Sequence, residues 1–192
     1  MKNLAVRSFT GFIFVLGIVS GLIFSKYGFV VLFSVIIIFS LWEFYMLTYK
    51  AFARPQKYFG ILIGVSFFIA TYLYVSQKVD AKIFCFFIPL LISIFIFELY
   101  RKSKRPFNNI AYTILGLFYI ALPITLFNHF VFYYTTHVVY NYHILLGFFI
   151  LLWANDTGAY LVGVSIGRTR LFERVSPKKS WEGALGGALL AL

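Results

Sequence analysis

Asp156 is the residue whose type and position most clearly call for a chemical explanation. It is the only formally charged residue between Pro106 and Gly167, and small or polar residues surround it in the sequence NDTG. A carboxylate within a membrane segment is stable only beside water, a cation or a partner group. We therefore expect Asp156 to face a water-accessible site, as a catalytic residue and as the ligand of a divalent cation. The alternative is a buried ion pair with a basic group from another helix.

A strongly basic segment follows Asp156 closely and is the most polar part of the chain. It runs from Gly163 to Gly183 and reads GVSIGRTRLFERVSPKKSWEG. Its Ser176-Pro177 pair predicts a turn. Ser180 and Glu182 are typical of the first positions of a helix, which we expect to begin there.

Two adjacent lysines, Lys178 and Lys179, stand directly before that predicted helix. Ammonium groups beside the free backbone N–H groups of a helix N-terminus suit a polyphosphate. With a divalent cation at Asp156, the arrangement favours phosphoryl transfer. Charge alone would also fit a plain membrane-orientation signal. The candidate substrate-binding residues are Arg168, Arg174, Ser176, Lys178, Lys179, Trp181 and Glu182.

Composition decides what kind of protein must position these residues. Of the 192 residues, 61% are hydrophobic and only 12% are charged, whereas an ordinary soluble domain carries about 25% charged residues. A soluble core of this size cannot bury so much apolar surface. Soluble enzymes, disordered tails and coiled coils are therefore excluded. The expected fold is all-α, a polytopic helical bundle integral to the lipid bilayer.

Six apolar stretches are long enough to cross a bilayer core of about 30 Å as helices. A polar segment with histidines separates the last two, and all six are expected to form one membrane domain over residues 1–192. After a loop over 164–182, the uncharged residues 183–192 reach only about half a bilayer. We expect them to begin a seventh span, in a piece of a longer protein. The six predicted spans are 8–25, 27–49, 58–77, 83–100, 109–130 and 142–163.

The basic residues lie mainly on one side of these predicted spans. Only Lys26, Lys78 and Lys82, of 17 basic residues, fall on the other side. Positive charge marks cytoplasmic loops, so the N-terminus and the 164–182 loop are expected in the cytoplasm and the protein in the bacterial inner membrane. This pattern accounts for the net charge of +11, so no nucleic-acid partner is expected. A homodimer is left open.

The segment from Asn155 to Gly187 resembles the bacterial phosphatidate cytidylyltransferases, or CDP-diacylglycerol synthases. Those enzymes carry an Asp-Thr-x-Ala-Tyr helix, a Gly-rich basic loop and the sequence Ser-Pro-Lys-Lys-Thr-Trp-Glu-Gly. Here Ser180 replaces the usual Thr, and a weaker resemblance extends over the N-terminal spans, including Glu43. The matching positions are Asp156, Thr157, Ala159, Tyr160, Gly163, Gly167, Ser176, Pro177, Lys178, Lys179, Trp181, Glu182 and Gly183.

The resemblance implies a magnesium-dependent reaction of CTP with phosphatidate, giving CDP-diacylglycerol and pyrophosphate. It covers the N-terminal two-thirds of such an enzyme, and a Lys-Asp pair and a His-Gly-Gly…Asp-Arg stretch with further metal-binding acids are expected beyond it. Two other functions stay open. A small transporter could use Asp156 as an ion or proton site, and a membrane stub could lack catalysis altogether.

Overall fold

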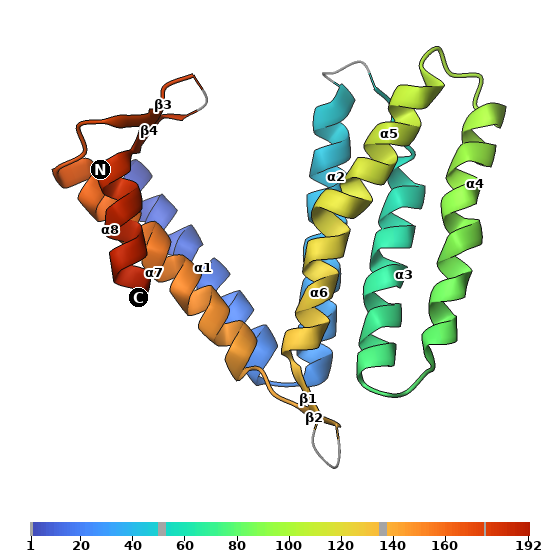
Figure 1. The fold of residues 1–192 in the computed structure, drawn as a ribbon, viewed down its shortest axis with the longest axis horizontal. Coiled ribbons are helices and arrows are strands. Elements are labelled where there is room, and N and C mark those ends of the chain that lie inside the picture. Colours follow the sequence, from blue (N-terminus) through green and yellow to red (C-terminus); the bar gives the residue numbers. More distant parts are fainter. Residues whose placement is uncertain (1, 50–52, 135–137, 175) are drawn as a thin grey trace. The chain divides into compact units, whose positions relative to one another are not determined.

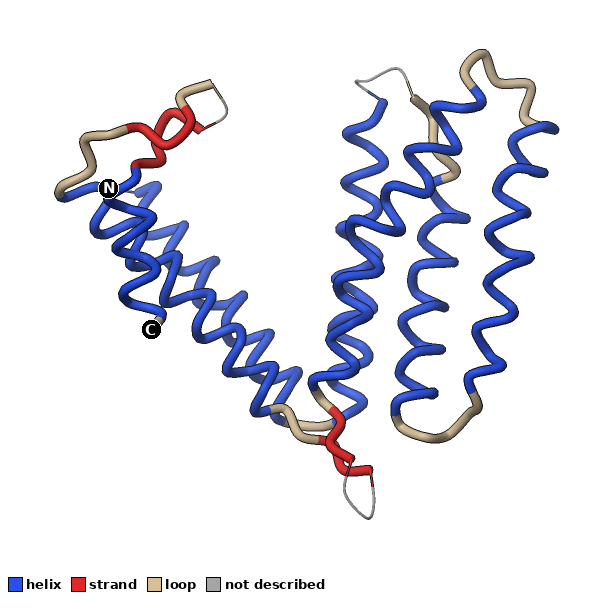
Figure 2. The backbone as a smooth tube through the Cα atoms, in the orientation of Figure 1, coloured by secondary structure: helices blue, strands red, loops and turns tan. Residues whose placement is uncertain are grey.

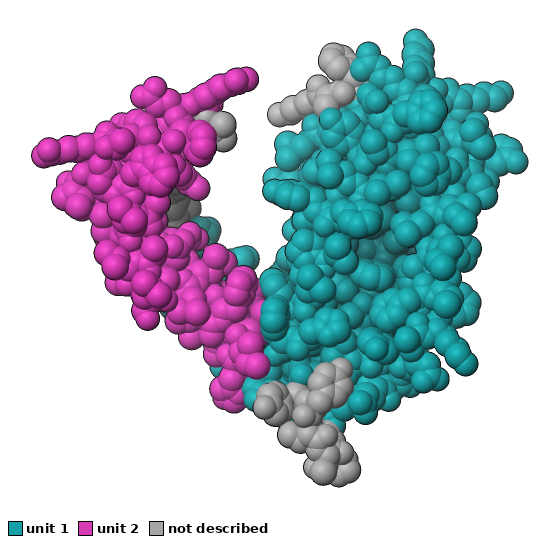
Figure 3. Space-filling view, viewed as in Figure 1, with its two compact units in different colours: residues 1–142 teal, residues 143–192 magenta. Residues whose placement is uncertain are grey.

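The computed structural model describes residues 2–49, 53–134, 138–174 and 176–192 and is mostly helical (Figure 1). The sequence predicts one membrane domain, whereas contacts divide the chain into two compact units, Met1–Tyr142 and His143–Leu192 (Figure 3). Each unit is described by itself below.

The first unit consists of membrane-length helices and one short hairpin. The π-helical turn η3 joins α5 to α6 in one continuous helical segment. The hairpin pairs β1 with β2 antiparallel, Tyr133 lying opposite Val139 (Figure 2). The elements are α1 (Lys2–Ile23), α2 (Lys26–Thr48), α3 (Lys57–Val75), the 3-10 helix η2 (Ala81–Phe86), α4 (Phe87–Tyr100), α5 (Pro106–Gly116), η3 (Leu117–Ala121), α6 (Leu122–Phe130), β1 (Phe132–Tyr134) and β2 (Val138–Tyr140).

The second unit is a helical pair joined by a second hairpin. Its elements are α7 (His143–Ser165), β3 (Arg170–Phe172), β4 (Ser176–Ser180) and α8 (Trp181–Ala191). The two hairpins were not predicted, because three- to five-residue strands leave no periodic signal in so short a stretch.

Five helical segments in the described residues are long and apolar enough to cross a membrane: 26–48, 57–75, 81–100, 106–130 and 143–165. Between 11% and 44% of each apolar window is buried inside the protein, so most of these side chains are left for lipid. The predicted class, a helical protein with several membrane spans, is confirmed. The apolar part described in α1, Phe9–Ile23, is shorter than these five segments.

A stripe of α2 residues spaced four apart forms the core of the first unit. Tyr45, at its end, is fully buried, and its hydroxyl donates a 2.9 Å hydrogen bond to the backbone carbonyl of Thr113. A Cβ at Gly60 or Gly116 would collide with the Tyr45 ring. Glycine at these two positions therefore lets α3 and α5 close around the ring. The stripe comprises Phe29, Phe33, Ile37, Leu41 and Tyr45.

Candidate functional site

The site residues of the second unit are positioned by unusually close packing of α7 on α8. A Cβ built on Gly187 would lie 2.6 Å from the backbone oxygen of Asn155. One built on Gly158 would lie 2.8 Å from the backbone oxygen of Gly186. Small residues allow membrane helices to approach this closely. The packing holds the NDTG segment of α7 against α8.

The basic segment between these helices folds as an antiparallel hairpin. Strand β3 pairs with β4 in the register Arg170↔Ser180 and Phe172↔Ser176. The turn predicted at Ser176-Pro177 is therefore wrong, since both residues lie in β4. Proline is tolerated near the start of an edge strand, where its missing N–H breaks no ladder. The observed turn comes just earlier and includes Glu173 and Arg174.

The predicted helix start is confirmed at Ser180. This residue is the N-cap of α8, and its hydroxyl accepts a 3.2 Å hydrogen bond from the backbone N–H of Gly183. The cap fixes the point where the hairpin ends and α8 begins. The backbone N–H of Trp181 also donates to the carbonyl of Thr169 at 3.0 Å, which closes the base of the hairpin.

Glu182, in the first turn of α8, fastens the chain that enters this hairpin. Its carboxylate accepts hydrogen bonds from the backbone N–H groups of Thr169, at 3.1 Å, and Arg168, at 3.2 Å. Bonding from its own backbone N–H, and then from Thr169 and Arg168, lowers the pKa of Glu182 from 4.5 to about 2. Glu182 therefore carries its negative charge throughout the physiological range and acts as a clamp.

A cavity of about 600 Å³ lies between α7, the hairpin and α8. This volume is within the range typical of small-molecule sites. Four of the candidate residues meet in its lining: Asp156, Ser176, Lys178 and Lys179. A carboxylate, a hydroxyl and two ammonium groups thus share one space, which can hold a phosphate chain and a cation together.

Asp156 is exposed on α7. Among the described residues of the second unit, no hydrogen bond or ion pair to its carboxylate is found. An exposed carboxylate in a membrane helix is stable only where water or a cation reaches it. Within its own unit, the exposed carboxylate of Asp156 is therefore available to water or a cation.

The remaining candidates lie outside the described lining of this cavity. Arg168 and Arg174 are exposed, and Trp181 is 56% exposed. Glu182 contributes through its hydrogen bonds to the backbone. Their shared segment brought these four residues together in the prediction, but none of them is among the described lining residues of the cavity.

Three polar lining residues, Asn155, Tyr160 and Ser180, were not among the predicted binding residues. Tyr160 lies four residues after Asp156, and residues at this spacing share a helix face. That spacing could have identified it. Ser180 was recognised only as a helix cap, and it serves both as cap and as wall.

The described residues contain no group of three or more His, Cys, Asp and Glu side chains that could hold a metal ion. Magnesium, however, is commonly bound by one or two carboxylates together with substrate phosphates and water. Asp156 beside two phosphate-attracting lysines fits an ion that binds together with a nucleotide. The donor set does not form a complete protein cage.

Comparison with known proteins identifies similar sequences in several bacteria. The phosphatidate cytidylyltransferase of Haemophilus influenzae is 48% identical over 59 residues, which cover 31% of this chain and 20% of that protein. That of Staphylococcus aureus strain COL is 32% identical over 91 residues, or 47% and 32% of the two chains. That of Aquifex aeolicus is 29% identical over 169 residues, covering 72% of this chain and 62% of the relative.

This chain thus spans between a fifth and about three-fifths of the length of these relatives. No solved structure gives a significant match. The cytidylyltransferase family matches residues 5–192, which include nearly all of the sequence and the whole α7–α8 cavity. The chain therefore belongs to the cytidylyltransferase family.

Proposed function

We propose that the protein transfers the cytidylyl group of CTP to phosphatidate, giving CDP-diacylglycerol and pyrophosphate. The observation that carries the proposal is the α7–α8 cavity, where Asp156, Lys178 and Lys179 meet. The match to the cytidylyltransferase family supports it, and so do the names of the relatives, each a phosphatidate cytidylyltransferase.

In the proposed reaction, a phosphate oxygen of the lipid attacks the α-phosphorus of CTP. The bond from that phosphorus to the bridging oxygen of the β-phosphate breaks, and pyrophosphate leaves with the bond electrons. Lys178 and Lys179 bind the triphosphate as point charges, and Ser176 offers a hydroxyl donor. Their task is to hold the two substrates in line and to balance the charge that accumulates on the leaving group.

Asp156 is proposed to hold Mg²⁺ at the same phosphates, where the ion would neutralise negative charge. Arg168, Arg174 and Trp181 are proposed to guide substrate at the margin of the hairpin. Glu182 is proposed to act indirectly, by fixing the backbone of Arg168 and Thr169.

The proposal includes a membrane arrangement that suits a lipid and a nucleotide. It has six full spans and the start of a seventh, with the N-terminus and the 164–182 segment in the cytoplasm of a bacterial inner membrane. The one-sided distribution of basic residues supports this orientation.

The test is direct assay of the full-length protein, purified in detergent with CTP, phosphatidate and Mg²⁺. We expect equal amounts of CDP-diacylglycerol and pyrophosphate. The variant Asp156→Asn should lose this activity, whereas Glu173→Gln, which changes an exposed acid outside the cavity lining, should keep it. A folded protein that forms no CDP-diacylglycerol under these conditions would refute the proposed function.

A further inference from the structure

A second basic cavity lies in the first unit, where α4 ends and α5 begins. Its volume is about 440 Å³. Five cationic side chains line it, together with one serine and one asparagine, and no carboxylate is among its described lining residues. The lining comprises Arg54, Arg101, Lys102, Ser103, Lys104, Arg105 and Asn109.

A buried polar network holds this cavity in shape. The carboxylate of Glu98, which is 2% exposed, pairs with the Arg101 guanidinium at 2.8 Å. It also accepts hydrogen bonds from the side-chain amides of Gln56, at 3.1 Å, and Asn109. Glu98 and its partner Arg101 lie three residues apart at the end of α4, and the network extends to α5.

Arg101 and Asn109 connect that network to the cavity wall. The guanidinium of Arg101 also donates to the backbone carbonyl of Arg54 at 3.0 Å. The amide of Asn109 donates to the hydroxyl of Ser103 at 2.7 Å, and its oxygen accepts from the backbone N–H of Arg54. Three chain segments are therefore fixed around one basic space.

A membrane-orientation signal needs positive charge in a loop but no particular arrangement of the side chains. This loop has one. Lys102 adopts a left-handed backbone conformation, with φ of 48°, which costs a non-glycine residue free energy. A fixed cluster of cations with one partner carboxylate is typical of an anion site.

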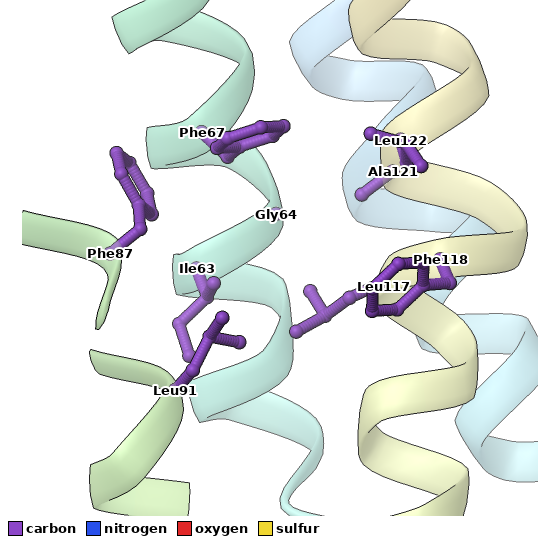
Figure 4. A pocket seen from close by; sticks show the side chains of 9 residues that line it. All are labelled: Ile63, Gly64, Phe67, Phe87, Leu91, Leu117, Phe118, Ala121 and Leu122. Carbon is purple, nitrogen blue, oxygen red and sulfur yellow. The ribbon is translucent and has the colours of Figure 1, made fainter. Parts of the chain in front are cut away.

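An apolar cavity lies deeper in the same unit. Figure 4 shows Ile63 and Phe67 of α3 and Phe87 and Leu91 of α4 on one side of it, with Leu117 and Phe118 of η3 on the other. Its volume is about 110 Å³, enough for part of one hydrocarbon chain. Leu91 precedes Arg101 by ten residues along the chain, and α4 rises about 15 Å over that distance, which is half a bilayer core.

From these two cavities we infer that the first unit binds an anionic phospholipid. Its phosphate occupies the basic cavity at Arg101–Arg105, and one acyl chain reaches the apolar cavity beside Leu91. A lipid is favoured over a soluble polyphosphate because its charged and apolar parts are separated by the distance between the cavities. None of its residues belongs to the α7–α8 unit, and none has a role in the proposed reaction.

The experiment measures lipid binding to the full chain by native mass spectrometry in detergent. Dioleoyl phosphatidate is titrated onto a K178Q/K179Q background, so that phosphate binding at the α7–α8 cavity is weakened throughout. In that background K102Q/K104Q should weaken binding about 20- to 30-fold, since each lysine near an anionic lipid contributes about 1 kcal/mol. The matched pair K78Q/K82Q changes two exposed lysines outside the cavity and should change binding less than twofold.

Two further measurements test the charge of the lipid headgroup and the role of the acyl chain. Dioleoyl phosphatidylcholine binding should not respond to K102Q/K104Q. Leu91→Trp, which fills the apolar cavity, should weaken binding of dioleoyl but not of dihexanoyl phosphatidate.

Unchanged phosphatidate binding in K102Q/K104Q would overturn the site. CTP and pyrophosphate are titrated in the same way. If K102Q/K104Q weakens their binding but not the binding of phosphatidate, the site binds a soluble ligand and the inference is wrong. Equal effects of Leu91→Trp on both chain lengths would overturn the placement of the acyl chain. Because the readout is lipid binding and not catalysis, these results are independent of whether Asp156→Asn abolishes cytidylyl transfer.

Discussion

At the scale of single residues, Asp156 makes the strongest prediction. Asp156→Asn keeps the size of the side chain and removes its charge. If the carboxylate acts at a metal, the full-length variant should insert and purify normally but lose turnover by orders of magnitude. Activity should be measured across a magnesium titration.

A buried ion pair would behave differently from a metal ligand at this position. Removing Asp156 would leave a buried cation without its partner, at a cost of about 3–5 kcal/mol in stability. Poor folding of Asp156→Asn, or near-parental activity at every magnesium concentration, would remove this residue from the proposed site.

The two cavity lysines should affect nucleotide binding more than turnover. Lys178→Ala and Lys179→Ala each remove one charge-assisted contact, worth about 1.5–3 kcal/mol. We expect the KM for CTP to rise roughly ten- to a hundredfold in either variant. Arg170→Ala is the matched control, because it lies on the same hairpin but outside the described cavity lining. An unchanged KM with defective membrane insertion would make the lysines orientation signals.

Residue types alone were sufficient to single out four residues that line this cavity. Asp156 and the two lysines stood out because charge is rare in the surrounding sequence, and all three line one cavity. The hydrogen bonds of Glu182 could not be predicted in this way. Two of its hydrogen-bond donors are backbone groups 13 and 14 residues earlier, and no side-chain pattern indicates which backbone N–H groups will point toward it.

At the scale of elements, the Glu182 clamp predicts how the hairpin responds to pH. The folded-state pKa of Glu182 is lowered to about 2 from 4.5, so folding favours the charged form. Its stabilising contribution is fully present above about pH 4.5 and is lost as the pH falls toward 2. The protection of the Thr169 amide against hydrogen exchange should fall across that range.

The same clamp can be tested at neutral pH by substitution. Glu182→Gln removes the charge that strengthens the two backbone hydrogen bonds, so the amides of Arg168 and Thr169 should exchange faster. Glu173→Gln, in the turn of the same hairpin, should leave them unchanged. Equal protection in both variants would show that the clamp does not hold the hairpin.

The close packing of α7 on α8 can be tested with two neighbouring residues of α8, one at the helix contact and one exposed. Gly187→Val places a side chain against the backbone of Asn155, and overpacking of this kind typically costs about 1–3 kcal/mol. Ala188→Val adds similar bulk at an exposed position and should cost little. Thermal unfolding followed by tryptophan fluorescence should separate the two variants. Equal melting temperatures would mean that the two helices do not pack this closely.

Short elements were the ones that the sequence could not predict. Ser180 was identified as a helix cap because capping depends on residues three positions apart, and that is a local pattern. The β3–β4 hairpin depends instead on pairing across the turn, so Ser176-Pro177 looked like a turn when considered alone. Local composition could not show that the turn lies a few residues earlier.

At the scale of the whole molecule, the proposed orientation can be tested with one cysteine. The native Cys85 is exposed, so the test starts from Cys85→Ser. Thr169→Cys should react in intact cells only with reagents that cross the inner membrane. Lys78→Cys should react with an impermeant maleimide. Labelling of Thr169→Cys by the impermeant reagent would reverse the orientation.

Long apolar runs predicted the membrane helices well, because α2 needs only hydrophobicity over 23 residues to be recognised. Division of the chain into two units was not predicted. It depends on where helices contact one another, and the hydropathy of α7 resembles that of the helices before it.

The π-helical turn at Leu117–Ala121 has a consequence for how the 106–130 segment tolerates change. Buried positions along this segment recur every four residues, at Asn109, Thr113, Leu117, Ala121 and Thr125. In a regular α-helix such a series drifts about 40° with each step, and the wider π turn corrects that drift in one place. The π turn therefore keeps the buried positions on one face of the segment, and packing constrains the number of residues in it. Deleting one residue there would restore ordinary helical geometry and turn Asn128 away from α3, where its side-chain amide donates to the backbone carbonyl of Phe68. The shortened segment would still be long and apolar enough to span the membrane.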